Sequence, residues 1–131
     1  MTHTFHDIGI AQQVGSYSDA AEVAADCRWL VTAGTPGLDR NGTLPNDITG
    51  QAELAWKHIL AMLERAGMTV DDLVKVTQYL VRRSDIPAYV KVRSRVLGNA
   101  RPASLLLVVP DGHVRPDFLL EIEAVAAKSA P

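Results

Sequence analysis

The sequence predicts an α+β protein in which two helices cover one face of a mixed β-sheet. Two amphipathic helical segments alternate with apolar, strand-like segments, giving the order β-β-α-β-α-β-β. No repeat, linker or low-complexity stretch divides the 131 residues. We therefore expect one domain over residues 1–131, long enough to bury roughly two thirds of the surface that its unfolded chain exposes.

The first third of the chain carries short strand patterns. Residues 20–26 and 28–34 are predicted strands, the second rich in β-branched and aromatic side chains. A further strand is expected near Phe5. Turn residues follow at 35–37 and 39–42, where Gly and Asn tolerate the backbone angles of tight turns.

Two amphipathic helices follow. Asn46 or Asp47 can cap the first, and Gly67 is placed to end it. Ser84 or Asp85 can cap the second, which Gly98 ends. Residues 74–82, between the helices, are predicted to form a strand. The apolar positions recur at three- and four-residue steps: Ala52, Ala55, Ile59, Met62, Leu63 and Ala66 in the first helix, and Tyr89, Val92 and Val96 in the second.

The last third of the chain reads as two apolar strands, 105–109 and 118–126. Glu121 and Glu123 stand at i and i+2 in the second strand, so both side chains point to one face of the sheet. Paired acids in so apolar a strand indicate a site. The strands also hold more apolar residues than two helices can cover, so we expect association through the other face. These residues are Val74, Val76, Leu105, Leu107, Leu120 and Ile122.

Composition excludes several classes of function. The net charge is -2 and the 13 basic residues are scattered, which argues against a nucleic-acid-binding surface. The single cysteine, Cys27, excludes an internal disulfide and a thiolate-rich metal site. No signal-peptide or membrane-spanning pattern is visible, so a cytoplasmic location is expected. The histidines show no metal-ligand spacing: His3, His6, His58 and His113.

Several segments, in order along nearly the whole chain, together resemble the Rid family, also called YjgF or endoribonuclease L-PSP. They are Gly15-Ser16-Tyr17-Ser18, Leu30-Val31-Thr32-Ala33-Gly34, Gly42-Thr43-Leu44-Pro45, Gln51-Ala52, Ala66-Gly67-Met68-Thr69, the segment from Asp72 to Thr77, Pro102-Ala103, and Glu121-Ile122-Glu123-Ala124-Val125-Ala126. No single piece is specific, but the set is.

The resemblance implies a chorismate-mutase-like protomer and a homotrimer whose central barrel buries the sheet faces. It also implies a ligand cleft at each subunit interface. Archetypal members hydrolyse reactive enamines and imines, made by pyridoxal-phosphate enzymes, to 2-keto acids and ammonia. They use no metal and no organic cofactor, and we expect none here.

The resemblance also assigns site residues. Tyr17, Gly34 and Glu121 match the family, in which the Tyr and Gly shape the pocket and the Glu positions water. Other positions depart from the pattern: Ser104 replaces an Arg that grips the substrate carboxylate, Ala33 replaces a Ser, Val90 replaces an Asn, and Leu106 stands where some members have Cys.

The loss of the Arg at position 104 has a physical consequence. An Arg–carboxylate fork gives charge-assisted hydrogen bonds worth roughly 1.5–3 kcal/mol each, which a hydroxyl does not reproduce. A standard 2-imino acid is therefore not the expected substrate. Arg101 and Lys91 are the candidate replacement cations, although Arg101 has the opposite strand parity and Lys91 resembles an exposed helix lysine. Glu123 is a candidate rim or interface charge.

Two functions compete. In the first, the protein hydrolyses a small imine or enamine that lacks a 2-carboxylate or carries its charge elsewhere. Glu121 then activates water, Gly34 and Ser104 hold the polar end of the substrate, and Tyr17, Val90 and Leu106 line the pocket. The alternative is a non-catalytic trimeric protein that binds a small metabolite in the same cleft. A nuclease is disfavoured by the charge balance.

Overall fold

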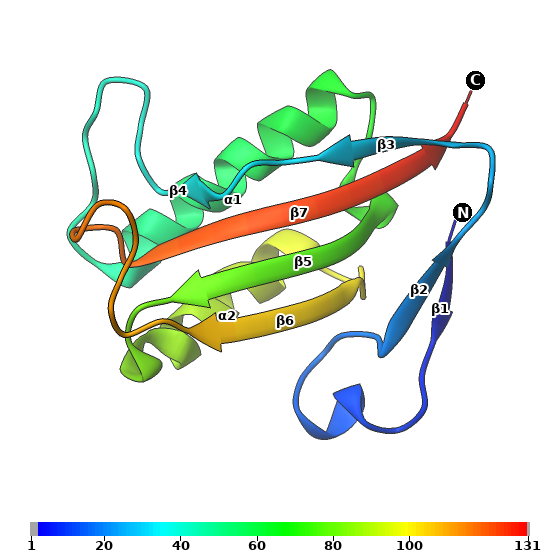
Figure 1. The fold of residues 1–131 in the computed structure, drawn as a ribbon, viewed down its shortest axis with the longest axis horizontal. Coiled ribbons are helices and arrows are strands. Elements are labelled where there is room, and N and C mark those ends of the chain that lie inside the picture. The colour runs from blue at the N-terminus through cyan, green and yellow to red at the C-terminus, as the bar shows by residue number, and fades with distance from the viewer. Residues whose placement is uncertain (1–2, 131) are drawn as a thin grey trace.

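A computed structural model describes residues 3–130. The main sheet has the strand order β3 (Cys27–Val31), β7 (Leu120–Ser129), β5 (Leu73–Leu80) and β6 (Ala103–Val108), with the short β4 (Thr35–Pro36) also pairing with β7 (Figure 1). β5 and β6 are parallel, and the other pairs are antiparallel. A separate two-stranded sheet joins β1 (His3–His6) to β2 (Ala20–Val23).

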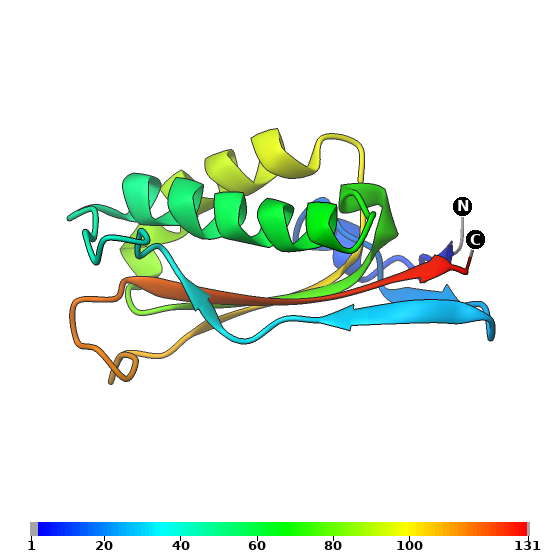
Figure 2. The same ribbon diagram turned by 90° about the horizontal axis from the view of Figure 1, so that it is seen from above.

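Both long helices lie on the same face of the main sheet (Figure 2). α1 (Ile48–Arg65) and α2 (Ile86–Leu97) bury their apolar sides against it, and short 3-10 helices lie at Ala11–Gln13, Val70–Asp72 and Arg83–Asp85. Asp47 begins α1 by accepting the backbone N–H of Gly50 at 2.8 Å. The core includes the fully buried side chains of Trp56, Ile59, Leu63, Tyr89, Val76, Leu120 and Ile122.

The predicted fold class, a mixed sheet with two helices on one face, is confirmed, and the strand expected near Phe5 is β1. Several details differ. The strands predicted over 20–26 and 28–34 end at Val23 and Val31, and β4 lies where turn residues were predicted. Asp85 begins α2 without capping it, because its carboxylate accepts a hydrogen bond from Arg82 Nε at 2.9 Å instead.

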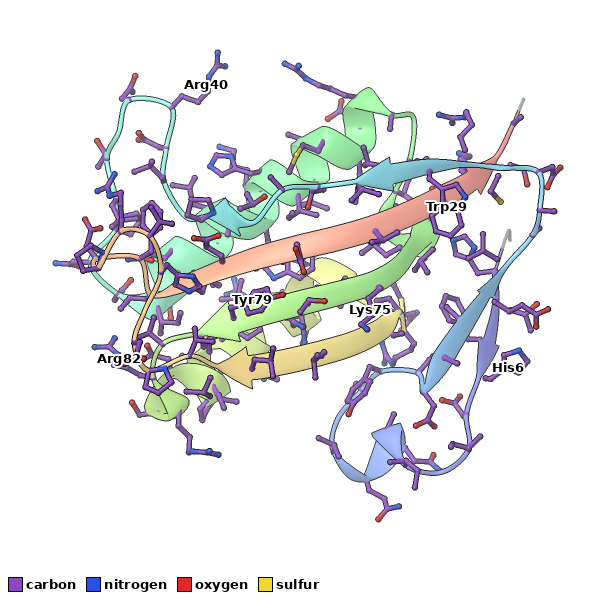
Figure 3. The ribbon with its side chains drawn as sticks, in the orientation of Figure 1. His6, Trp29, Arg40, Lys75, Tyr79 and Arg82 are labelled. Carbon is purple, nitrogen blue, oxygen red and sulfur yellow. The ribbon has the colours of Figure 1, made fainter. Side chains whose placement is uncertain are left out.

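The strand residues divide between two faces by alternation. Val76, Leu120 and Ile122 are buried under the helices, whereas Leu105 and Leu107 are 45% and 39% exposed on the opposite face. We call this second side the open face. Trp29 and Val31 of β3 are also exposed there, at 57% and 71%. Figure 3 shows Trp29 on this face with Lys75 and Tyr79 of β5. The main sheet is thus covered on one side only in the described protomer.

Within residues 3–130 there is no helix with both the length and the apolar character needed to cross a membrane.

Candidate functional site

Four of the residues predicted to bind substrate line one hollow of about 290 Å³, which we call the Tyr17 pocket: Tyr17, Val90, Ser104 and Leu106. The pocket lies where α2, β6 and the loop before β2 meet. Val14, Gly15, Ile86, Arg93 and Leu105 complete its lining. Its volume suits a small molecule, and its walls are mainly apolar.

Two sets of contacts fix the loop that carries Tyr17. Ser18 donates its backbone N–H to Pro102 O at 3.3 Å and its hydroxyl to Arg101 O at 2.6 Å. The Asp19 carboxylate accepts the backbone N–H groups of Ile8 and Ala11, both at 2.8 Å. Hydrogen bonding from these amides, Ile8 first, lowers the pKa of Asp19. The loop is therefore tied to the start of β6, beside Ser104.

A fully buried amide, Gln78 on β5, lies behind the pocket. Its Nε2 donates to Ser104 Oγ at 3.0 Å and to Leu105 O at 2.9 Å. Its Oε1 accepts from Tyr89 Oη at 2.7 Å and from Arg93 Nη1 at 2.9 Å. Burial raises the pKa of Tyr89, so this phenol stays protonated and donates. The Gln78 amide thus sets the orientation of both Ser104 and Arg93.

Glu121 belongs to a second cluster, which we call the Glu121 site. A methyl group at Gly34 would lie 2.5 Å from Glu121 Oε1, so the glycine leaves the space that the carboxylate occupies. On the other side, His113 Nδ1 lies 3.4 Å from Glu121 Oε2, within ion-pair range. The two side chains are only 9% and 21% exposed, respectively. The Glu121 carboxylate therefore lies between the backbone of Gly34 and the imidazole of His113.

The hydrogen bonding of His113 constrains where its protons lie. Nε2 is 3.1 Å from the carbonyl oxygen of Tyr79, which only accepts, so Nε2 carries a hydrogen. Nδ1 is then the ring nitrogen that faces the Glu121 carboxylate. A carboxylate and an imidazole placed side by side can take a proton from water and return it.

The two clusters lie on opposite faces of the sheet. Ser104 pairs with Val76, which is buried under the helices, whereas Glu121 pairs with Tyr79 on the open face. Within one chain, the side chains of Ser104 and Glu121 therefore do not face one another.

The other candidate residues lie outside the Tyr17 pocket. Ala33 is exposed next to Gly34, and its carbonyl oxygen accepts the hydroxyls of Thr32 and Thr35 at 2.9 and 3.0 Å. Glu123 shares the open face with Glu121 and accepts Tyr79 Oη at 2.8 Å. That hydrogen bond raises the pKa of the Tyr79 hydroxyl.

Neither of the two candidate replacement cations lines the Tyr17 pocket. Arg101 is exposed and donates Nη1 to Gly98 O at 2.8 Å and to Ala100 O at 3.0 Å, at the end of α2. Lys91 is exposed and lines a different hollow with Thr49 and Arg95.

Two residues of these clusters, Arg93 and His113, were not predicted as site residues from the sequence. Arg93 lies on the same side of α2 as the two pocket residues Ile86 and Val90, which are seven and three positions before it, and that spacing was the available signal. His113 lies in the loop between β6 and β7, and no periodicity places a loop side chain. Within the described residues, no cluster of three or more His, Cys, Asp or Glu side chains is arranged to hold a metal ion.

Taken together, the fold and the two clusters define a small α+β protein with a small-molecule pocket and a carboxylate–imidazole pair. The chain matches the model of the endoribonuclease L-PSP family over residues 10–128 and belongs to that family, the Rid or YjgF family. A RutC family protein of Pyrococcus abyssi is 32% identical over 117 residues, which cover 88% of each chain.

Two further similar proteins share the fold. TdcF of Escherichia coli, named provisionally as a reactive intermediate deaminase, is 25% identical over 119 residues, covering 89% of this chain and 90% of TdcF. A crystal structure of TdcF with bound serine superposes with a TM-score of 0.71 over 88% of this chain and 91% of that one. The Rid-family protein YyfB of Yersinia pestis shares the fold with a TM-score of 0.83 at 23% identity, covering 98% of this chain and all of that one.

Proposed function

We propose that this protein hydrolyses a small, reactive enamine or imine in a cleft between two copies of the chain. The observation that carries the proposal is the Glu121 carboxylate, held between Gly34 and His113. The provisional name of TdcF as a reactive intermediate deaminase supports the same reaction class.

The proposed reaction is a hydrolysis that needs no oxidant or reductant. An enamine first takes a proton on carbon and loses one from nitrogen, which makes it an imine. Glu121 then accepts a proton from water, whose oxygen attacks the imine carbon, and returns that proton to the nitrogen. The new hydroxyl group next gives its proton to Glu121, which passes it to the nitrogen as the carbon–nitrogen bond breaks. Ammonia leaves, and the carbon keeps the oxygen as a carbonyl.

The site is completed by association. Because the Tyr17 pocket and Glu121 lie on opposite faces of one protomer, a second copy must supply one of them. The proposed assembly is a homotrimer with a central barrel, and the exposed apolar side chains of the open face support it, because they would otherwise remain in water. The serine bound by TdcF supports a small molecule as the ligand.

Because Ser104 stands where the family has a carboxylate-binding Arg, we do not expect standard 2-imino acids to be the preferred substrates. The same substitution favours a second candidate function, a non-catalytic trimeric protein that binds a small metabolite in this cleft. A cytoplasmic location, and the lack of a cofactor and of nucleic-acid partners, remain predictions from the sequence.

The test generates imines in the reaction mixture. An amino-acid oxidase supplies 2-imino acids, and an amine oxidase supplies uncharged imines. Semicarbazide traps the imine that has not been hydrolysed as a semicarbazone. We expect the native protein to lower semicarbazone formation from at least one of these imines.

Glu121→Gln should abolish this effect, whereas Glu123→Gln, the matched change two residues further on the same face, should retain it. Ser104→Arg should shift the preference toward 2-imino acids. Ligand binding that survives Glu121→Gln, without turnover by the native protein, would favour the binding function.

A further inference from the structure

The Tyr17 pocket contains a cation that does not come from β6. Arg93 of α2 is half-buried and lines the pocket beside Ser104, Val90 and Leu106. One of its guanidinium nitrogens, Nη1, donates to Gln78 Oε1 at 2.9 Å. The guanidinium carbon lies 5.7 Å from the centre of the Tyr89 ring, which adds a cation–π contact.

This guanidinium has no anionic partner in the part of the chain that the structure describes. The ion pairs of residues 3–130 occupy Arg82, Arg95 and Arg115 among the arginines, but not Arg93. Arginine has five N–H donors, and a half-buried charge without a counter-ion is costly. The remaining donors of Arg93 are therefore available to an anion from outside the protomer.

The Gln78 amide also holds a second hydrogen-bond donor, the Ser104 hydroxyl, in the pocket that Arg93 lines. Because its Nε2 also donates to the carbonyl oxygen of Leu105, the amide cannot be reversed without losing that bond. Ser104 Oγ therefore accepts from Gln78, and its own hydrogen is free to donate into the pocket. A hydroxyl and a guanidinium held by one buried amide form a preorganised pair of donors.

We propose that Arg93 and Ser104 together bind the carboxylate of the ligand, so that α2 supplies the cation that β6 lacks. This inference rests on the proposed function for the reacting group, an imine or enamine. It adds that the substrate carries a carboxylate elsewhere than the 2-position of a standard 2-imino acid. A single cation among apolar walls fits a monoanionic carboxylate better than a doubly charged phosphate.

A purely structural role explains Arg93 less well. Gln78 Oε1 already accepts the Tyr89 hydroxyl at 2.7 Å, so the buried amide is satisfied without a charge. A neutral side chain would avoid the cost of desolvating a guanidinium. Binding of an anion needs a cation in the wall of the Tyr17 pocket, and Arg93 lies there.

The test measures binding, not turnover. Propanoate and its uncharged isostere propanamide are titrated into isotopically labelled native protein, and the arginine side-chain and backbone resonances are followed by NMR. We expect propanoate to bind at least 10-fold more tightly than propanamide. Arg93→Gln should weaken propanoate binding at least 10-fold and leave propanamide unaffected. Arg95→Gln, which removes the same charge from an exposed position on α2, is the matched control and should change neither.

Arg93→Lys tests the charge separately from the packing, and should retain more propanoate affinity than Arg93→Gln does. Equal weakening of both probes by Arg93→Gln, equal effects of Arg93→Gln and Arg95→Gln, or binding of inorganic phosphate as tight as that of propanoate would overturn the inference. So would failure of folded native protein to bind propanoate. Because no step depends on hydrolysis, a protein that binds propanoate through Arg93 but hydrolyses no imine refutes the proposed function alone.

Discussion

His113 Nδ1 lies 3.4 Å from Glu121 Oε2, while Nε2 of the same ring lies 3.1 Å from the backbone carbonyl of Tyr79. This pair joins the loop between β6 and β7 to the strand that carries the candidate catalytic carboxylate. It therefore places an imidazole directly beside that carboxylate.

Replacing His113 should impair turnover more than stability. We expect His113→Gln to lower kcat about 10- to 100-fold, because the variant removes a proton-transfer partner. The matched control is His58→Gln, because His58 also bonds a backbone carbonyl, Leu38 O at 2.7 Å, but forms no ion pair with a carboxylate of residues 3–130. Steady-state kinetics and thermal melts measure the two effects, and an equal loss of kcat in both variants would argue against a role of His113 in turnover.

Gly34→Ala should displace the Glu121 carboxylate without unfolding the protein. The added methyl group would lie 2.5 Å from Oε1, and the far end of a flexible side chain is what must move. We expect a roughly 10- to 100-fold loss of imine hydrolysis, because misplaced catalytic groups are costly, with only a small change in Tm. Steady-state kinetics and thermal melts measure the two effects. Full activity in this variant would show that hydrolysis does not require this position of Glu121.

The buried Gln78 amide should contribute strongly to stability. Gln78→Leu leaves the Tyr89 hydroxyl and an Arg93 N–H without their acceptor, and we expect a loss of about 3 kcal/mol in the free energy of unfolding. Tyr89→Phe removes one donor and leaves Arg93 on Gln78, so its cost should be about 1 kcal/mol. Denaturant unfolding measures both. Equal costs for the two variants would contradict this account of the network.

Asp19 should make the loop that carries Tyr17 sensitive to acid. Its pKa is lowered from the usual 3.8, chiefly by the hydrogen bond from the Ile8 amide. The carboxylate therefore stabilises the fold above the unfolded-state value, and this contribution is lost as the pH falls through the lower folded-state value. We expect Asp19→Ala to be less stable than native protein at pH 7, with the difference shrinking below about pH 4. Hydrogen exchange at Ile8 and Ala11 measures the loosening, and a difference that is constant with pH would refute it.

The open face should hold copies of the chain together. We expect native protein to sediment as a trimer and Leu107→Glu to dissociate it, because the charge would be buried at the interface. Leu60 on α1 is exposed to the same extent, 39%, on the helical side of the molecule. Leu60→Glu should therefore leave the sedimentation coefficient unchanged. Dissociation by both variants, or by neither, would count against this face as the interface.

Local sequence patterns predicted much of the fold because they depend on neighbouring residues. The helical repeat from Ala52 to Leu63 gave α1 its buried side, and Gly67 adopts the positive φ of 70° expected where that helix ends. The i, i+2 spacing of Glu121 and Glu123 likewise predicted that both lie on one face of the last strand. By contrast, β4 spans two residues, too few for any alternation to be visible.

The sequence by itself determined the element types, the family, and the residues Tyr17, Ser104 and Glu121 as candidates for one site. Only the tertiary structure decided that Ser104 and Glu121 lie on opposite faces, because strand register sets which side chains share a face. It also brought Arg93 and Ser104 together on the Gln78 amide, and His113 to Glu121. These contacts join residues of different elements, and the packing of a helix and a loop on the sheet, not local periodicity, creates them.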